Sequence, residues 1–348
     1  MDRQYKPEPG PEPAPGPLSG ARPTVRPAVR RAVRRGLCGW LAAAGSSGAL
    51  ALAALALPVL APAERGDRVL VVAPHIDDEA IAAAGYAAEA LARGAEVYVV
   101  YMTAGDCNRF AAALLEHTFR PRAQSLLHEG EARIREGRLA MAELGVPADH
   151  VFLLGYPDQG LRAMRDNPGS VIPSRGTGRT AVPYPQAISP GAFYTLSNLE
   201  ADLARVIAIA KPTTVIAPVP FDRHPDHAAT GLLVRDQVSR LRPQPRLLGY
   251  LVHSAHYPRP LAYAPGLRLL PPARFAGEEW RAYPLSKDGE RRKVKLLAFY
   301  RSQKKDPYLR FLLDAFVREN ELYVEGGGKE LTYARAKAPK VPAAPPAH

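Results

Sequence analysis

From Arg68 onward the chain alternates between short continuous apolar runs and longer amphipathic segments. A continuous β-branched run is typical of a strand covered on both faces, and apolar residues spaced three and four apart are typical of a helix. The pattern predicts strands at 69–73, 96–102, 151–154 and 213–217, and helices at 79–93, 130–144 and 199–209. This order predicts an α/β fold with a doubly wound, mostly parallel sheet of the Rossmann-like type.

The chain before this region has a different composition. Residues 1–35 are rich in Pro, Gly and Arg and have almost no large apolar side chains, which predicts a disordered basic tail. Residues 36–63 contain no charged residue, and about 20 apolar residues suffice to cross a bilayer core of about 30 Å. We therefore predict a transmembrane anchor or signal segment at 36–63. The arginines before it predict a single-pass membrane protein with a cytoplasmic N-terminus and an extracytoplasmic domain.

Other interpretations of this apolar segment remain open. Ala61-Pro62-Ala63 loosely resembles a processing site, and cleavage there would give a secreted or periplasmic protein. The pair Arg34-Arg35 resembles a twin-arginine signal. A buried helix of the folded domain fits worst, because small residues on all sides leave no polar face for water.

The folded domain is predicted at 66–335, followed by a Pro-rich tail at 336–348. Within the domain, residues 163–197 are full of Pro, Gly, Ser and Thr and are too long for a plain connection. A substrate-covering loop and a decoration of the fold are equally compatible with this stretch.

Charge and cysteine content exclude several classes of protein. The 46 basic and 34 acidic residues give a formal charge of +12, but eight basic and three acidic residues fall within the first 35 positions, so roughly +5 belongs to the tail. No dense basic stripe with interleaved aromatic residues follows, which argues against a nucleic-acid partner. Cys38 and Cys107 are too few for a disulfide framework or a thiolate zinc site, so any metal must be held by His and carboxylates.

The first predicted strand runs directly into Pro74-His75-Ile76-Asp77-Asp78-Glu79. Open α/β sheets place their ligands at this end of a strand. Asp77 or Asp78 alone is explained by helix capping, but capping explains neither His75 nor adjacent carboxylates, whose repulsion raises the cost of burial unless a cation compensates. His75 and Asp78 can both reach one metal ion and leave the neighbouring carboxylate free for proton transfer.

A second cluster, His224-Pro225-Asp226-His227, follows the strand predicted at 213–217. Parallel strands have their carboxyl ends on the same edge of a sheet, so the two clusters can meet in space. If His227 joins His75 and Asp78, two nitrogens and one oxygen hold the metal and leave open positions, as in a catalytic zinc site.

These two clusters resemble the signatures of the PIG-L/LmbE-like N-deacetylases. Similar supporting motifs are present, and the resemblance spans about residues 68 to 325. The motifs are Thr103-Ala104-Gly105-Asp106, Arg133-x-x-Glu136, Gly155-Tyr156-Pro157-Asp158 and Tyr300-Arg301-Ser302-Gln303. The chain departs from the usual pattern at Ile76, where Pro is common, which changes the stiffness of the loop but removes no ligand.

The resemblance implies a zinc-dependent hydrolase that removes an N-acetyl group from an amino sugar or glycoconjugate. It implies that His75, Asp78 and His227 hold Zn²⁺, or another divalent metal, and that Asp77 is the general base. Zinc lowers the pKa of bound water to around 7, which supplies a nucleophile at neutral pH.

The resemblance also implies roles for residues around the metal. His224 would act as an electrophile on the carbonyl oxygen, would stabilise the oxyanion if its imidazole is protonated, and would be oriented by Asp226. Arg133 and Asp158 would contact substrate. Glu79 would support the loop.

Three rival functions are compatible with parts of the pattern: an amidase on another N-acyl compound, a non-catalytic metal-dependent glycan-binding domain, and a nicotinamide oxidoreductase. The absence of Gly-x-Gly-x-x-Gly after the first strand argues against the last. His253 and His256 fit either the same pocket or a structural role, and the sequence does not indicate an oligomeric state.

Overall fold

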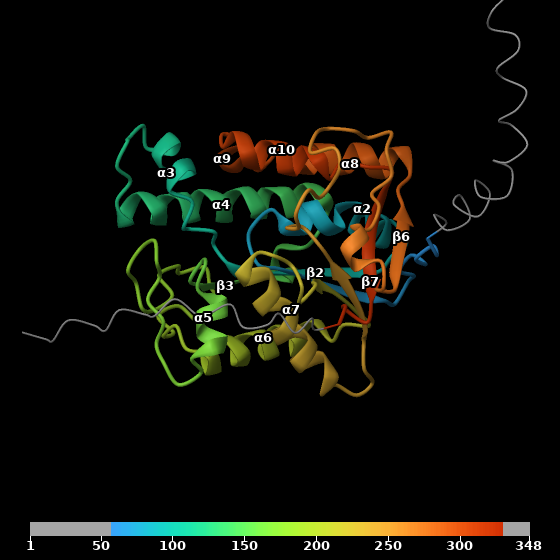
Figure 1. The fold of residues 1–348 in the computed structure, drawn as a ribbon. Coiled ribbons are helices and arrows are strands. Elements are labelled where there is room, and N and C mark those ends of the chain that lie inside the picture. The colour runs from blue at the N-terminus through green and yellow to red at the C-terminus, as the bar shows by residue number, and fades with distance from the viewer. Residues whose placement is uncertain (1–56, 330–348) are drawn as a thin grey trace, which may run out of the picture. The chain divides into compact units, whose positions relative to one another are not determined.

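A computed structural model describes residues 57–329, which form a seven-stranded sheet between two layers of helices (Figure 1). The strand order is β3-β2-β1-β4-β5-β7-β6. The strands are β1 (Arg68–Ala73), β2 (Glu96–Thr103), β3 (Val151–Tyr156), β4 (Thr214–Pro218), β5 (Arg246–Tyr250), β6 (Trp280–Pro284) and β7 (Asn320–Glu325). Every residue of β4, and all but the first of β1, is buried, as a strand covered on both faces requires.

The strands β3, β2, β1, β4 and β5 pair in parallel, whereas β7 is antiparallel to both β5 and β6. The chain first builds outward from β1 through β2 to β3, and then crosses to the other side of β1 to form β4. This reversal makes the carboxyl ends of β1 and β4 the switch point at which such sheets bind ligands. The predicted α/β class with a doubly wound, mostly parallel sheet is therefore confirmed.

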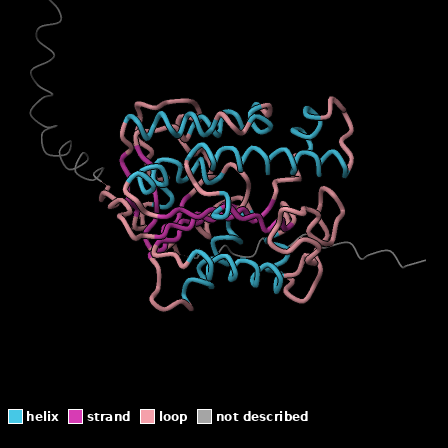
Figure 2. The backbone as a smooth tube through the Cα atoms, turned by 180° about the vertical axis from the view of Figure 1, so that it is seen from behind, coloured by secondary structure: helices cyan, strands magenta, loops and turns pink. Residues whose placement is uncertain are grey.

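Helices cover both faces of the sheet. The layer above it in Figure 1 contains α2, α4, α8, α9 and α10, with α3 beside them, and the layer below contains α5, α6 and α7. Figure 2 shows the same two layers from behind, with the strands between them. The helices are α2 (Asp78–Ala92), α3 (Arg109–Leu115), α4 (Ala123–Leu144), α5 (Leu161–Asp166), α6 (Leu196–Ala210), α7 (Pro225–Ser239), α8 (Lys287–Leu297), α9 (Arg301–Lys304) and α10 (Pro307–Ala315).

The predicted strands and helices are all present, with ends shifted by up to three residues except at α4. This helix begins at Ala123, seven residues before the predicted start, because Ser125, Leu126 and Leu127 are buried and continue its inward face. The antiparallel part of the sheet and helices α8 to α10 were not predicted, since their short patterns gain stability mainly from distant partners.

The carboxyl end of the segment predicted to cross the membrane lies on the folded domain. Leu60 is 1% exposed, its N–H donates to the carbonyl oxygen of Ala282 in β6, and Val59 forms an isolated bridge with the same residue. The rest of that segment, residues 36–56, lies outside the described residues, as do the predicted tails at 1–35 and 336–348. Among residues 57–329, no helix has both the length and the apolar character needed to span a bilayer.

Candidate active site

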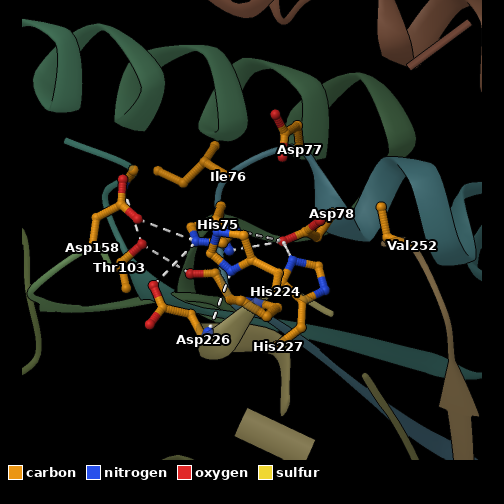
Figure 3. A network of polar contacts seen from close by, with 12 residues as sticks. His75, Ile76, Asp77, Asp78, Thr103, Asp158, His224, Asp226, His227 and Val252 are labelled. Carbon is orange, nitrogen blue, oxygen red and sulfur yellow. Dashed lines mark hydrogen bonds and ion pairs between the residues drawn. The ribbon is translucent and has the colours of Figure 1, made fainter. Parts of the chain in front are cut away.

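The two predicted clusters meet at the switch point of the sheet. His75 lies two residues after the end of β1, while His224 precedes α7 and His227 lies in its first turn. The ring centroids of His75 and His224 are 4.8 Å apart, and the ring of His227 lies 5.3 Å from each of them. Figure 3 shows the three imidazoles together with Asp78. The predicted convergence of distant stretches is therefore present in the structure.

One carboxylate oxygen connects two of these imidazoles. The Oδ2 atom of Asp78 lies 3.2 Å from Nδ1 of His75 and 3.1 Å from Nε2 of His227. Asp78 stands at the start of α2, so the fold of the β1–α2 turn brings its carboxylate back toward His75, whose N–H also donates to it at 2.9 Å. The three side chains predicted as metal ligands thus face one another within a few ångströms.

The residues present fit a divalent cation. His227 is fully buried, yet neither of its ring nitrogens makes a hydrogen bond; they lie only at ion-pair distance from Asp78 and Asp222. A buried nitrogen without a hydrogen bond is costly unless another partner satisfies it. Among the described residues, three groups have possible ligand atoms within 4.8 Å of one another: His75, His224 and His227; Asp78, His227 and His253; and His75, Asp158 and Asp226. Nitrogen and carboxylate donors of this kind suit zinc.

The pKa shifts of Asp78 and His227 also favour a bound cation. Burial raises the pKa of Asp78, but the imidazoles of His227 and His75 outweigh burial and hold that pKa well below its usual value. Burial lowers the pKa of His227, but Asp78 and Asp222 outweigh it and raise that pKa to about 9. The carboxylates therefore stabilise positive charge at these imidazoles, and a metal ion would take the place of the protons.

Asp77 lies on the other side of this turn, toward α4 (Figure 3). It occupies the position before α2 but its side chain makes no capping hydrogen bond, so capping does not explain it. Its backbone has a φ of 146°, a conformation that costs of order 1–3 kcal/mol and persists where the surroundings impose it. Here Arg133 donates to its Oδ2 at 3.2 Å, and its own N–H donates to Glu79 at 3.1 Å.

The environment of Asp77 changes its acidity. Burial raises its pKa to about 7, with Arg133 opposing and Asp78 adding to the shift. A carboxyl with a pKa near neutrality suits proton transfer. Asp77 lines the same cavity as His75, Asp78 and His224.

Arg133 holds the Asp77 loop. Its Nη2 donates to the carbonyl oxygen of Ile76 at 2.8 Å, and its Nη1 donates to that of Gly105 at 3.1 Å. Arg133 also lines the cavity, as predicted for a substrate contact, but its hydrogen bonds in the structure position Asp77.

Asp226 contacts His224 through its main chain and not through its carboxylate. That carboxylate accepts the N–H groups of Gln159 at 2.6 Å and Leu161 at 3.0 Å, and it lies 3.4 Å from Nε2 of His75. Asp226 reaches His224 only through its main chain, since its N–H donates to His224 Nδ1 at 3.3 Å. The first turn of α7 turns the carboxylate away from His224 and toward the loop before α5.

The environment of His224 favours the neutral imidazole over the protonated form. Burial and the imidazoles of His75, His227 and His253 lower its pKa to about 2. Because its Nδ1 accepts a hydrogen bond, the proton of the neutral ring lies on Nε2, which is then a donor.

Asp158, predicted as a substrate contact, lines the cavity beside His75. Its Oδ1 lies 3.3 Å from Nε2 of His75, and its Oδ2 accepts the N–H of Cys107 at 3.0 Å. Burial raises its pKa, but His75 and Arg133 outweigh burial and lower it to about 2, so this carboxylate stays charged. Asp158 and Asp226 together therefore orient the ring of His75 through its Nε2 atom, which faces away from Asp78.

Two residues of the site, Asp222 and His253, were not assigned to it from the sequence. Asp222 lies behind His227, with Oδ2 3.4 Å from Nδ1, and it also accepts the N–H groups of Val252 and His253 at 3.0 Å. His253, left open between a pocket and a structural role, has its ring centroid 4.6 Å from that of His227 and lines the cavity. The position of Asp222, four residues after β4, was the available signal. His256 does not line this cavity.

The segment Tyr300-Arg301-Ser302-Gln303 is hydrogen-bonded to the loop that carries Asp77 and to α4. The hydroxyl of Tyr300 donates to Glu79, whose other oxygen accepts the N–H of Asp77. The N–H and hydroxyl of Ser302 donate to Glu136 on α4 at 2.8 and 2.7 Å. The predicted role of Glu79 in supporting the loop is therefore confirmed.

The site borders a cavity of about 440 Å³, which also touches α3 and α10. The site residues that line it are His75, Asp77, Asp78, Arg133, Asp158, His224 and His253. No residue of 163–197 lines it. That stretch instead packs behind the site, where the hydroxyl of Tyr184 donates to Asp106 at 2.7 Å.

Replacing Gly105 with alanine should destabilise the domain by about 2 to 4 kcal/mol, since it combines a strained φ with overpacking. Gly105 has a φ of +70°, and an added Cβ would lie 2.3 Å from Cζ of Arg133. Gly66 has a φ of +92° with open space around it, so Gly66→Ala should cost only about 1 to 2 kcal/mol. Denaturant unfolding measures both; equal losses would contradict the proposed clash.

Comparison with known proteins supports the motif analysis. A family model described as PIG-L, GlcNAc-PI de-N-acetylase, matches residues 70–238. A 1D-myo-inositol 2-acetamido-2-deoxy-alpha-D-glucopyranoside deacetylase of Streptomyces scabiei is 31% identical over 169 residues, which cover 47% of this chain and 45% of the relative. A protein of the same description from Kribbella flavida is 32% identical over 167 residues, covering 46% of this chain and 50% of the relative. The chain spans about half the length of the curated relatives it matches.

Among solved structures, N,N'-diacetylchitobiose deacetylase from Pyrococcus horikoshii shares 20% sequence identity at a TM-score of 0.45, over 75% of this chain and 84% of that one. The family match over residues 70–238 contains both clusters, from His75 to Glu79 and from His224 to His227. Residues 70–238 therefore match the PIG-L deacetylase family model, which agrees with the resemblance that the motifs predict.

Proposed function

We propose that this chain is a metal-dependent N-deacetylase that hydrolyses the acetamide of an N-acetylated amino sugar or glycoconjugate. The observation that supports it best is the position of Asp78 Oδ2 between Nδ1 of His75 and Nε2 of His227, with the separate carboxylate of Asp77 in the same cavity. The curated relatives, described as deacetylases of a 2-acetamido sugar linked to inositol, support the substrate class.

We propose His75, Asp78 and His227 as the ligands of Zn²⁺, with another divalent metal as the alternative. When bound, the metal would supply Lewis acidity and lower the pKa of water. Side chains of the protein transfer the protons and stabilise the developing charge. Asp77 accepts the proton of the attacking water and returns it to the departing amine nitrogen, while the Nε2–H of His224 donates to the amide oxygen as negative charge develops there.

The surrounding residues keep these groups in place. Arg133 and Glu79 hold Asp77 in its strained conformation, so the base does not need to reorganise during the reaction. Asp222 at His227, and Asp158 and Asp226 at His75, orient the two imidazoles through their outer nitrogens.

Removal of the metal should abolish turnover. We expect one equivalent of zinc in the purified protein, release of free amine from N-acetylated sugars, at least a 100-fold loss of rate after chelation, and recovery on adding zinc. Metal analysis and an amine-release assay on a panel of N-acetylated sugars measure these quantities. Turnover that survives complete removal of metal would contradict the proposal.

The same panel separates the alternatives. Release of amine from N-acetyl amino acids or other N-acyl compounds, but from no sugar, would indicate an amidase of different specificity. Zinc-dependent binding of a sugar without any release of amine would indicate a glycan-binding domain.

A further inference from the structure

Glu129 of α4 is a buried acid that the proposed mechanism does not use. Its side chain is 0% exposed, and in the described part of the chain neither of its carboxyl oxygens has a hydrogen-bond partner. It does not line the cavity at the metal-binding side chains, so a substrate held there does not contact it directly. An ionised carboxyl buried in this way is costly, and a group in such a place takes up a proton and becomes neutral.

Gln303 of α9 lies beside Glu129 and also lines the cavity. Its side chain is fully buried as well. Its Nε2 donates to Oγ of Ser302 at 3.0 Å, whereas its Oε1 accepts no hydrogen bond from any residue in 57–329. Ser302 in turn donates to Glu136 on α4. The amide of Gln303 is therefore held at its nitrogen but not at its oxygen.

The protonation state of Glu129 decides whether these two neighbours can satisfy each other. An ionised carboxylate and an amide oxygen are both acceptors, whereas a protonated carboxyl has one O–H to donate. Buried polar atoms without partners are costly in a folded protein. A protonated Glu129 can therefore satisfy its own O–H and Oε1 of Gln303 with a single hydrogen bond.

The groups that face Glu129 come from three parts of the chain besides α9. Arg133 lies one turn further along α4, Asp106 follows β2, and Asp158 follows β3. Burial raises the pKa of Glu129 to about 8; Arg133 and Gln303 oppose this shift, and Asp158 and Asp106 add to it. The carboxyl is therefore neutral at pH 7 and ionises only in mildly alkaline solution.

We propose that Glu129 is a positioning residue of the deacetylation site, where its O–H donates to Oε1 of Gln303 and fixes that amide in the cavity wall. This inference rests on the proposed function, because the amide affects turnover only if the N-acetyl sugar occupies this cavity. Glu129 acts through Gln303 and does not touch the reacting atoms, so its loss should weaken substrate binding and leave the chemical step intact. Ionisation of Glu129 should have the same effect as its removal, since both abolish the donor.

The KM of the full-length, zinc-loaded protein for the methyl glycoside of N-acetylglucosamine tests this role. Glu129→Gln keeps a donor and should match the wild type at pH 7. Glu129→Met keeps the length of the side chain without a donor, so its KM should be about three- to tenfold higher at equal kcat, as expected for one lost hydrogen bond.

The same measurement as a function of pH does not require Glu129→Met to fold. The ratio of the wild-type KM to that of Glu129→Gln should rise from about 1 at pH 7 to about 3 to 10 at pH 9.5. The midpoint of this rise should lie near pH 8, where Glu129 loses its proton. Groups that titrate in both proteins cancel in the ratio.

A second readout is independent of turnover. An acid whose pKa is raised in the folded state contributes stability that is fully present below its ordinary pKa and is lost as the pH rises toward the folded value. The Tm of the wild type should therefore fall relative to that of Glu129→Gln between pH 5 and 8. Glu131→Gln is the matched control, because this exposed acid of α4 lies two residues away, and it should follow the wild type in both measurements.

The outcomes separate the positioning role from the proposed function. A KM ratio that stays at 1 up to pH 9.5, or an equal rise of KM in Glu129→Gln and Glu129→Met, overturns the positioning role while deacetylation itself stands. A Tm difference that does not change with pH overturns the neutral state of Glu129, and the proposed hydrogen bond with it. If the zinc-loaded wild type hydrolyses no N-acetylated sugar, the proposed function fails, and the positioning role fails with it.

Discussion

Asp77→Asn should lower kcat by about 10²- to 10⁴-fold and leave the zinc content unchanged. The substitution keeps the shape of the side chain but removes its capacity to accept a proton from water. Among the described residues, Asp77 makes no hydrogen bond or ion pair with a histidine; its carboxylate accepts a hydrogen bond from Arg133, and its main chain donates to Glu79. The loss should therefore appear in the chemical step and not in metal binding.

The measurement combines the rate of amine release with zinc stoichiometry on the same sample. Asp166→Asn is a suitable control, since Asp166 is an exposed carboxylate at the end of α5 that pairs with Arg162. We expect that variant to retain full turnover. Full turnover in Asp77→Asn, at one equivalent of zinc, would show that another group accepts the proton.

The clusters around His75 and His224 could be predicted because each follows a strand with a continuous apolar pattern. Two parallel strands that adjoin in a sheet end on the same edge, so placing β1 and β4 was enough to bring the clusters together. The residue types then determined the chemistry, because imidazole and carboxylate in one buried place require a compensating charge.

The carboxylate of Asp226 shows where such reasoning fails. Spacing alone places Asp226 two residues from His224, but its direction depends on the first turn of α7 and on the Gln159 and Leu161 N–H groups, which come from a distant loop. Such contacts between segments far apart in the chain have no periodic signature.

His253 was uncertain for a related reason. It follows β5, a strand of five residues whose apolar pattern is too short to distinguish from a loop. Strand β7 pairs with β5 in antiparallel orientation, and the paired residues lie more than 70 positions apart in the chain. Once β5 is placed beside β4, His253 lies at the same edge as His227, and the position of Asp222 between them is explained.

His227→Ala should abolish metal binding and turnover together. His227 is one of only three proposed ligands, and its removal would also leave Asp78 and Asp222 buried without the imidazole that separates them. Loss of a residue that merely orients a ligand weakens metal binding by about 10- to 100-fold, so loss of the ligand itself should exceed 100-fold. Zinc affinity, measured by competition with a chelator of known affinity, tests this expectation.

Two further variants provide reference values for the zinc affinity of His227→Ala. Asp222→Asn keeps the His227 ligand but weakens its orientation, so it should lower zinc affinity by about 10- to 100-fold and retain turnover at saturating zinc. His128→Ala removes an exposed histidine of α4 that pairs with Glu116, and it should change neither quantity. The three affinities should therefore fall in the order His128→Ala, Asp222→Asn, His227→Ala. Unchanged zinc affinity in His227→Ala would show that the metal lies elsewhere, and the proposed arrangement of ligand and base around one cavity would then be wrong.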